Sequence, residues 1–84
     1  MNDRVREILI AAAQASSFSP DPAVMKQLRD GSPQLTLAQF NFDSFAWMEF
    51  CISVELQCGQ ELTPADIEGM RFVFQIEEWL RARL

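Results

Sequence analysis

The chain of 84 residues contains no histidine. Histidine is the usual general base of enzymes and the commonest metal ligand, and Ser–His or Cys–His nucleophile systems depend on it. The two cysteines, Cys51 and Cys58, are too few to complete a tetrahedral zinc site. We therefore expect neither a catalytic site nor a metal site in this chain.

Basic residues are also scarce, with 7 Lys and Arg against 12 Asp and Glu and a formal net charge of -5. Binding of nucleic-acid phosphates requires a basic patch, and the sequence contains none. The charge balance instead favours a partner with a basic face.

Long apolar runs are absent, since none reaches the ~18 residues of a membrane-spanning helix. The charged first turn, Asn2 to Glu7, is not followed by the apolar core of a signal peptide. Cys51 and Cys58 are seven positions apart on one predicted helix, or roughly 10 Å, which is too far for a disulfide. We expect two reduced cysteines and a cytoplasmic protein.

Apolar spacing predicts an all-α domain over residues 1–84. An amphipathic helix is expected over about residues 3–16, with Asn2 or Asp3 as its N-cap. Further helices are expected over residues 44–58, 64–68 and 72–83, the third of these being short. The predicted fold is a bundle of three main helices and one short helix. Glu77 and Glu78 are predicted to lie on a solvated face.

A long first loop, residues 18–43, is broken by Pro20, Pro22, Gly31 and Pro33. Within it, a short helical turn is expected from Asp21 or Pro22 to near Gly31. The rest is predicted to be extended and to hold three apolar side chains against the helices: Leu35, Leu37 and Phe40. Loops of this length are usually functional.

The helix over residues 44–58 has two apolar stripes at about 100° per residue. One stripe comprises Trp47, Phe50, Cys51, Val54 and Cys58. The other comprises Phe45, Met48, Ile52 and Leu56, flanked by Glu49 and Glu55. The remaining arc is assigned to Ala46, Ser53 and Gln57. One stripe suffices to join a core, so the second must be covered by other parts of the chain or by a partner.

The dipeptide Asp43-Ser44 opens this helix, and both residue types are preferred caps, so a capping role alone explains them. The flanking Phe42 and Phe45, which a cap does not need, favour a further role. The stretch Phe40-Asn41-Phe42-Asp43-Ser44-Phe45 resembles the Asp-Ser-Leu motif of the acyl carrier protein family, which includes peptidyl carriers. Asn41 stands where Gly is usual, and Phe45 where Leu is usual. The stretch Glu61 to Ile67 resembles the loop into the family's third helix, and residues 72–80 resemble its last helix.

The resemblance implies that Ser44 carries a 4'-phosphopantetheine arm, transferred from coenzyme A by a phosphopantetheinyl transferase. Asp43 would help to position the metal and coenzyme A in the transferase complex. The chain would catalyse nothing itself, and acyl- or aminoacyl-loading enzymes and downstream synthases would act on the thioester. Partner recognition would fall to the second stripe and its acids, namely Phe45, Met48, Glu49, Ile52, Glu55 and Leu56. We expect a monomeric, free-standing carrier, with a domain of a larger synthase as the alternative.

The sequence departs from fatty-acid carriers where Ala46, Trp47 and Leu56 replace acidic residues. This more apolar face indicates a specialised pathway for a polyketide, a nonribosomal peptide or a modified fatty acid. Alternatively, Trp47 and Leu56 merely cover the long loop. A peptidyl or aminoacyl carrier, and a helical interaction module of the same fold without the arm, remain alternative functions.

Overall fold

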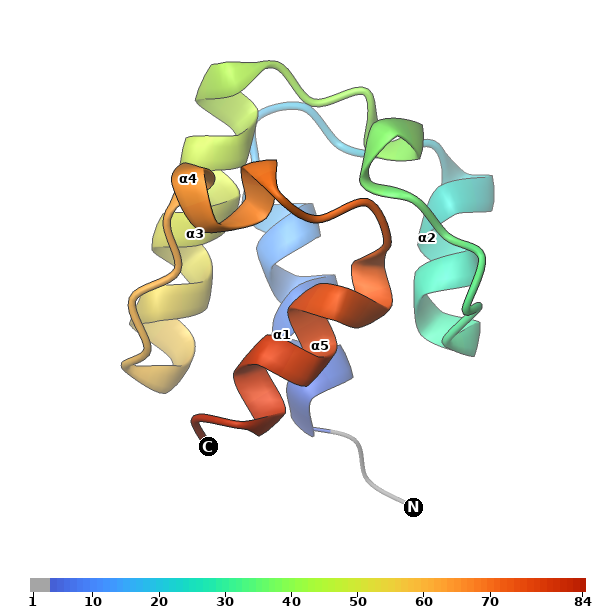
Figure 1. Ribbon diagram of the computed structural model, residues 1–84. Helices are drawn as coiled ribbons and strands as arrows, with labels where there is room; N and C mark the ends of the chain where they lie inside the picture. The colour runs from blue at the N-terminus through green and yellow to red at the C-terminus, as the bar shows by residue number, and fades with distance from the viewer. Residues whose placement is uncertain (1–3) are drawn as a thin grey trace.

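The central helix of the domain is α1, Arg4–Ala15. In the computed structural model, which describes residues 4–84, α1 packs against α3, α2 and α5 (Figure 1). Its inner face is the expected one, because Val5, Ile8, Leu9 and Ala12 are all buried. The predicted N-caps Asn2 and Asp3 lie outside the described residues.

The punctuated first loop contains more helix than the sequence predicted. Residues Pro22–Asp30 form α2, a helix of nine residues rather than a short turn. Asp21 caps it, since its Oδ1 accepts the N–H of Ala23 at 2.8 Å. Gly31 ends it at φ 70°, a left-handed conformation that suits glycine. The predicted set of three main helices and one short helix was therefore too small: residues 4–84 form five α-helices and one 3-10 helix.

The segment between α2 and α3 holds the three apolar side chains as expected, since Leu35, Leu37 and Phe40 are buried. Its last part is not extended, because residues Leu37–Phe40 form a 3-10 helix, η1. A single antiparallel bridge joins Thr36 to Phe72 at the start of the last helix. Its hydrogen bonds run from Leu37 N to Arg71 O and from Val73 N to Leu35 O, each 3.0 Å. This pairing ties the segment to the far end of the chain.

Helix α3 spans Ser44–Cys58, and its range coincides with the one expected. Phe50, Cys51 and Val54 are buried, while Trp47 and Cys58 are partly buried against the core. Ala46 was wrongly assigned to the outer arc, because it is 1% exposed. It lies four residues before Phe50 and so on the same side of the helix.

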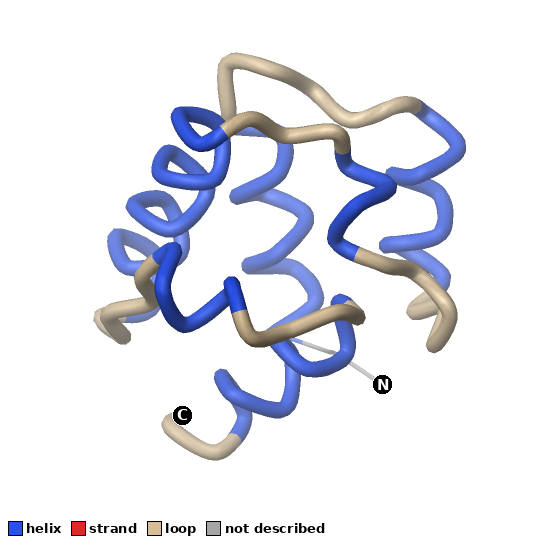
Figure 2. The backbone as a smooth tube through the Cα atoms, turned by 45° about the horizontal axis from the view of Figure 1, so that its top comes forward, coloured by secondary structure: helices blue, strands red, loops and turns tan. Residues whose placement is uncertain are grey.

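The short helix α4 and the longer helix α5 complete the chain (Figure 2). Helix α4, Pro64–Glu68, begins at a capping box in which Thr63 Oγ1 accepts the N–H of Asp66. Hydrogen bonds from Thr63 lower the pKa of Asp66. Helix α5, Val73–Arg81, buries Val73, Ile76 and Leu80.

The prediction that Glu77 lies on a solvated face was wrong, because this residue of α5 is buried. Its Oε1 lies 3.5 Å from Nε of Arg6 on α1. A buried carboxylate needs such a partner to offset its lost hydration. Glu78 is exposed, as predicted.

The domain is a compact all-α globule with a Cα radius of gyration of 11.4 Å. Residues 4–84 contain no strand beyond the isolated Thr36–Phe72 bridge. In the same described range, no helix combines the length and the apolar character that crossing a membrane would require.

Candidate functional site

Ser44 is the first residue of α3 and is exposed to solvent. The capping function belongs to Asp43, whose Oδ1 accepts the N–H of Ala46 at 2.8 Å. The first helical hydrogen bond runs from Trp47 N to Asp43 O at 3.0 Å. The N–H groups of Ser44 and Phe45 precede that bond, at the positive end of the helix dipole. A hydroxyl that the cap does not need thus lies where an anionic group is stabilised.

The chain reaches Ser44 through a sharp turn at Asn41, which has φ 57° and ψ 30°. This is the left-handed region, which glycine enters freely and asparagine tolerates better than other residues. The N–H of Asn41 donates to Ala38 O at 3.2 Å and closes η1. Asparagine at the position of the motif's glycine therefore fits the backbone found there.

Four aromatic rings pack together behind the start of α3. The ring centroids of Phe42 and Trp47 are 4.8 Å apart, those of Phe40 and Trp47 are 5.7 Å apart, and those of Trp47 and Phe50 are 5.4 Å apart. Edge-to-face and offset pairs of this kind add to the stability from burial. Trp47 therefore packs on the loop residues Phe40 and Phe42. Of the two interpretations of Trp47, this contact supports the one in which it covers the loop.

The second stripe of α3 is open to solvent along its whole length. Phe45 is 57% exposed, Met48 47%, Ile52 54% and Leu56 82%. Leu56 consequently covers no loop. Nothing within residues 4–84 buries this stripe, which contrasts with the buried side chains on the opposite face of the helix.

The two acids beside the stripe differ in their surroundings. Glu55 is exposed, whereas Glu49 is partly buried and bound to the chain that follows α1. Its Oε1 accepts the N–H of Ser17 at 2.9 Å and the Ser17 hydroxyl at 2.6 Å. Glu49 is thus already engaged within the domain.

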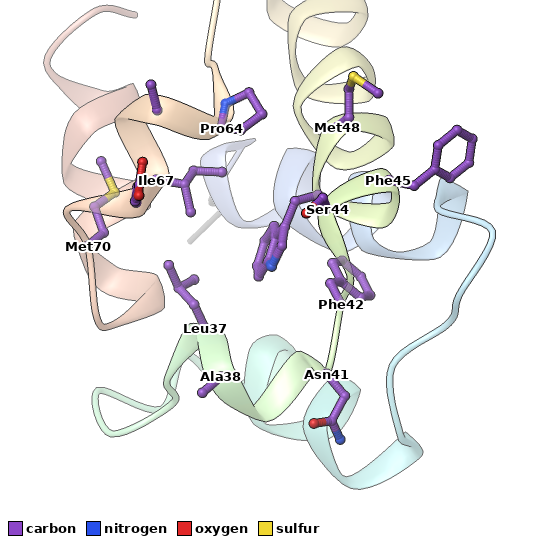
Figure 3. Close-up of a pocket in the computed structure, with 13 residues that line it drawn as sticks. Leu37, Ala38, Asn41, Phe42, Ser44, Phe45, Met48, Pro64, Ile67 and Met70 are labelled. Atoms are coloured by element: carbon purple, nitrogen blue, oxygen red, sulfur yellow. The ribbon is translucent and has the colours of Figure 1, made fainter.

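A groove of about 1090 Å³ runs past Ser44 between α3, η1 and α4 (Figure 3). Its lining is mostly apolar and includes Trp47 and Met48 of α3, Leu37 of η1, and Ile67 and Met70 on the α4 side. Phe45 and Met48, two members of the exposed stripe, also line this groove. Ser44 therefore lines the groove at the point where the groove meets the start of the exposed stripe.

The charged side chains at the start of α3 and along it are all acidic, namely Asp43, Glu49 and Glu55. Residues 30–70 contain seven carboxylates and no Lys or Arg. Glu68 is the one ionisable residue among those lining the groove. No group of three or more acidic or cysteine side chains within residues 4–84 is placed to hold a metal ion.

The residues on the α3 side of the groove were predicted from the sequence, whereas those of the opposite wall were not. Leu37 and Ala38 belong to η1, whose residues were expected to be extended. A signal for this helix was present, because Thr36 and Gln39 have the spacing of a capping box. Ile67 and Met70 carried no comparable signal, since they face Ser44 only through the tertiary fold.

Comparison with known proteins adds no relative: no family model, no curated protein and no solved structure matches the chain. The functional assignment therefore depends on the Asp43-Ser44 motif and on the geometry that surrounds it.

Proposed function

We propose that this chain is a carrier protein whose Ser44 bears a 4'-phosphopantetheine arm. The observation that supports this most directly is the exposed Ser44 hydroxyl at the first position of α3, with Asp43 acting as the cap. In this proposal the fold is that of the acyl carrier family, extended by the nine-residue α2.

The residues around Ser44 suit the phosphate of the arm. A phosphodiester on Ser44 would meet the N–H groups of Ser44 and Phe45 and the positive end of the helix dipole. The arm supplies a thiol that holds an acyl group as a thioester, and partner enzymes perform the chemistry. The chain's own residues present the hydroxyl, stabilise the anion and offer a surface for docking.

The groove and the stripe give this carrier two adjoining apolar surfaces next to its attachment point, which share Phe45 and Met48. The mostly apolar groove offers a resting place for the arm and its cargo. The stripe of Phe45, Met48, Ile52 and Leu56 offers partners an apolar strip with Glu55 beside it. Because this face is apolar and lightly charged, we assign the carrier to a specialised pathway for a polyketide, nonribosomal peptide or modified fatty acid.

The second candidate function is an interaction module that binds a partner through α3 and carries no arm. The observation that favours it is the same exposed stripe, which a partner could cover without any modification of Ser44.

The two functions are separated by the intact mass after incubation with coenzyme A and a promiscuous phosphopantetheinyl transferase. A carrier gains about 340 Da, the mass of one phosphopantetheine group. The gain disappears in Ser44→Ala and persists in the control Ser19→Ala, which removes another exposed serine. No gain with several transferases would leave only the interaction module.

A further inference from the structure

Phe18 lies just after α1 on a stretch of backbone that is fixed from both sides. The buried Ser16 Oγ is 2.9 Å from Ala13 O and 3.1 Å from Phe18 O. Ser17 is held by Glu49 of α3, through its N–H at 2.9 Å and its hydroxyl at 2.6 Å. Hydrogen bonds to a carboxylate are about twice as strong as neutral ones. The carbonyl of Phe18 and the residue before it are therefore both anchored.

The ring of Phe18 is nevertheless 56% exposed. A single exposed apolar side chain is unremarkable by itself. The position of Phe18 follows from Glu49, which binds the preceding residue Ser17. Glu49 lies four residues after Phe45 and three before Ile52 on α3. Side chains at these spacings share one helix face. The Ser17–Glu49 contact thus brings the Phe18 segment beside the exposed stripe.

An aromatic ring on an ordered backbone is suited to binding. Aromatic anchors often contribute most of the energy of an interface, and order in the free protein lowers the entropy lost on association. Glu49 acts here as a positioning residue, since it fixes the backbone of Ser17 rather than extending into solvent.

The charge of the surrounding surface indicates the chemistry of the occupant. The charged side chains beside the stripe, Glu49 and Glu55, are both acidic, so a second copy docking through the same face would meet like charges. An enzyme with an apolar pocket bordered by Lys or Arg complements this surface. Phe45 directly follows Ser44, so an enzyme that modifies Ser44 must come close to this end of the stripe.

We propose that Phe18 extends the docking surface for the transferase that modifies Ser44, and that Glu49 holds it in place. In the complex, an apolar pocket bordered by basic residues takes Phe18 together with Phe45. This inference rests on the proposed carrier function and adds to it a contact residue from outside α3.

The test is steady-state kinetics of a phosphopantetheinyl transferase with coenzyme A, with the chain as the varied substrate. Phe18→Asp is expected to raise KM about tenfold, the ratio that corresponds to about 1.4 kcal/mol, with kcat little changed. Phe74→Asp is the matched control, because Phe74 is an exposed ring on α5 and should leave KM unchanged.

The positioning role of Glu49 has its own readout. Glu49→Ala should raise KM and speed hydrogen exchange at the Ser17 amide, because the acceptor is lost. Glu49→Gln keeps a side-chain oxygen for Ser17 and should restore most of the wild-type KM and the amide protection.

The outcomes separate this inference from the carrier function. If the wild type is modified and Phe18→Asp has a KM within twofold of it, Phe18 is not part of the surface. A Phe18→Asp chain that loses its helix content would show a structural role and overturn the inference. A dimer that dissociates in Phe18→Asp would assign the surface to a second copy. If the wild type is never modified, the carrier function fails and this inference fails with it.

Discussion

Asp43 and Ala46 are joined by the hydrogen bond that starts α3, with Asp43 Oδ1 2.8 Å from Ala46 N. From the sequence alone, either residue of the Asp-Ser pair could have capped the helix. The contact assigns the capping role to Asp43. Asp43 caps the helix through one of its oxygens, and the exposed Ser44 hydroxyl takes no part in the cap, as the proposed attachment of an arm requires.

Substitutions can separate the helix-capping role of Asp43 from its proposed role in positioning metal and coenzyme A. Asp43→Ala removes the cap and should lower the free energy of unfolding by about 0.5–2 kcal/mol in a urea titration. Asp43→Asn keeps a side-chain oxygen for Ala46 and should retain stability. If the carboxylate also positions metal and coenzyme A, Asp43→Asn should slow modification of Ser44 strongly. An Asp43→Asn chain modified at the wild-type rate would limit Asp43 to the cap.

The two faces of α3 predict opposite effects of substitution. Phe50 is buried, so Phe50→Ala should cost about 3–5 kcal/mol of stability, and a loss well below 1 kcal/mol would contradict its place in the core.

Met48→Glu or Ile52→Glu, by contrast, changes an exposed position and should alter stability by no more than about 0.5 kcal/mol. Either change should impair transfer to or from partner enzymes, since it places a charge in an apolar contact. Urea titration measures the effect on stability, and transfer rates on the same preparations measure the effect on partner enzymes. Unfolding by either substitution would show that the stripe belongs to the core.

The contact between Arg6 and Glu77 links α1 to α5. Glu77→Ala should lower the free energy of unfolding by about 1–3 kcal/mol, because it leaves a charged partner short of a contact. The neighbouring Glu78→Ala is the matched control, since Glu78 is exposed and its loss should be within about 0.5 kcal/mol. Equal effects of the two substitutions would argue against a structural role for the pair.

Sequence periodicity and capping residues were sufficient for the helices that carry the site. Asp43 and Gly59 delimit α3, and Thr63, Pro64 and Asp66 start α4 by rules that act within a few residues. The left-handed conformation of Asn41 follows from similar local chemistry.

Contacts between distant segments could not be predicted in this way. Glu77 was expected on a solvated face together with Glu78, and its partner Arg6 is 71 positions away. Glu49 was expected to offer a free charge, but Ser17 binds it across the fold. The groove opposite Ser44 likewise depends on how α4 and η1 pack against α3, which no local pattern specifies.

The two cysteines should differ in reactivity. Burial, assisted by the nearby negative charge of Asp66, raises the pKa of Cys51 to about 11. At pH 8 only about a thousandth of it is thiolate, the form that alkylates. Iodoacetamide should therefore label the partly buried Cys58 before Cys51 in the folded protein, as read by peptide mass spectrometry. The thiol of an attached arm should react faster than both, and labelling of Cys51 first would contradict its buried position.

The central claim is that Ser44 is the attachment point of the arm. The most direct test is fragmentation mass spectrometry of the protein isolated from its native cells. The carrier function predicts an added mass of about 340 Da, or that mass with an acyl group, confined to fragments that contain Ser44. A native protein with an unmodified Ser44, or with the added group on another residue, would contradict it.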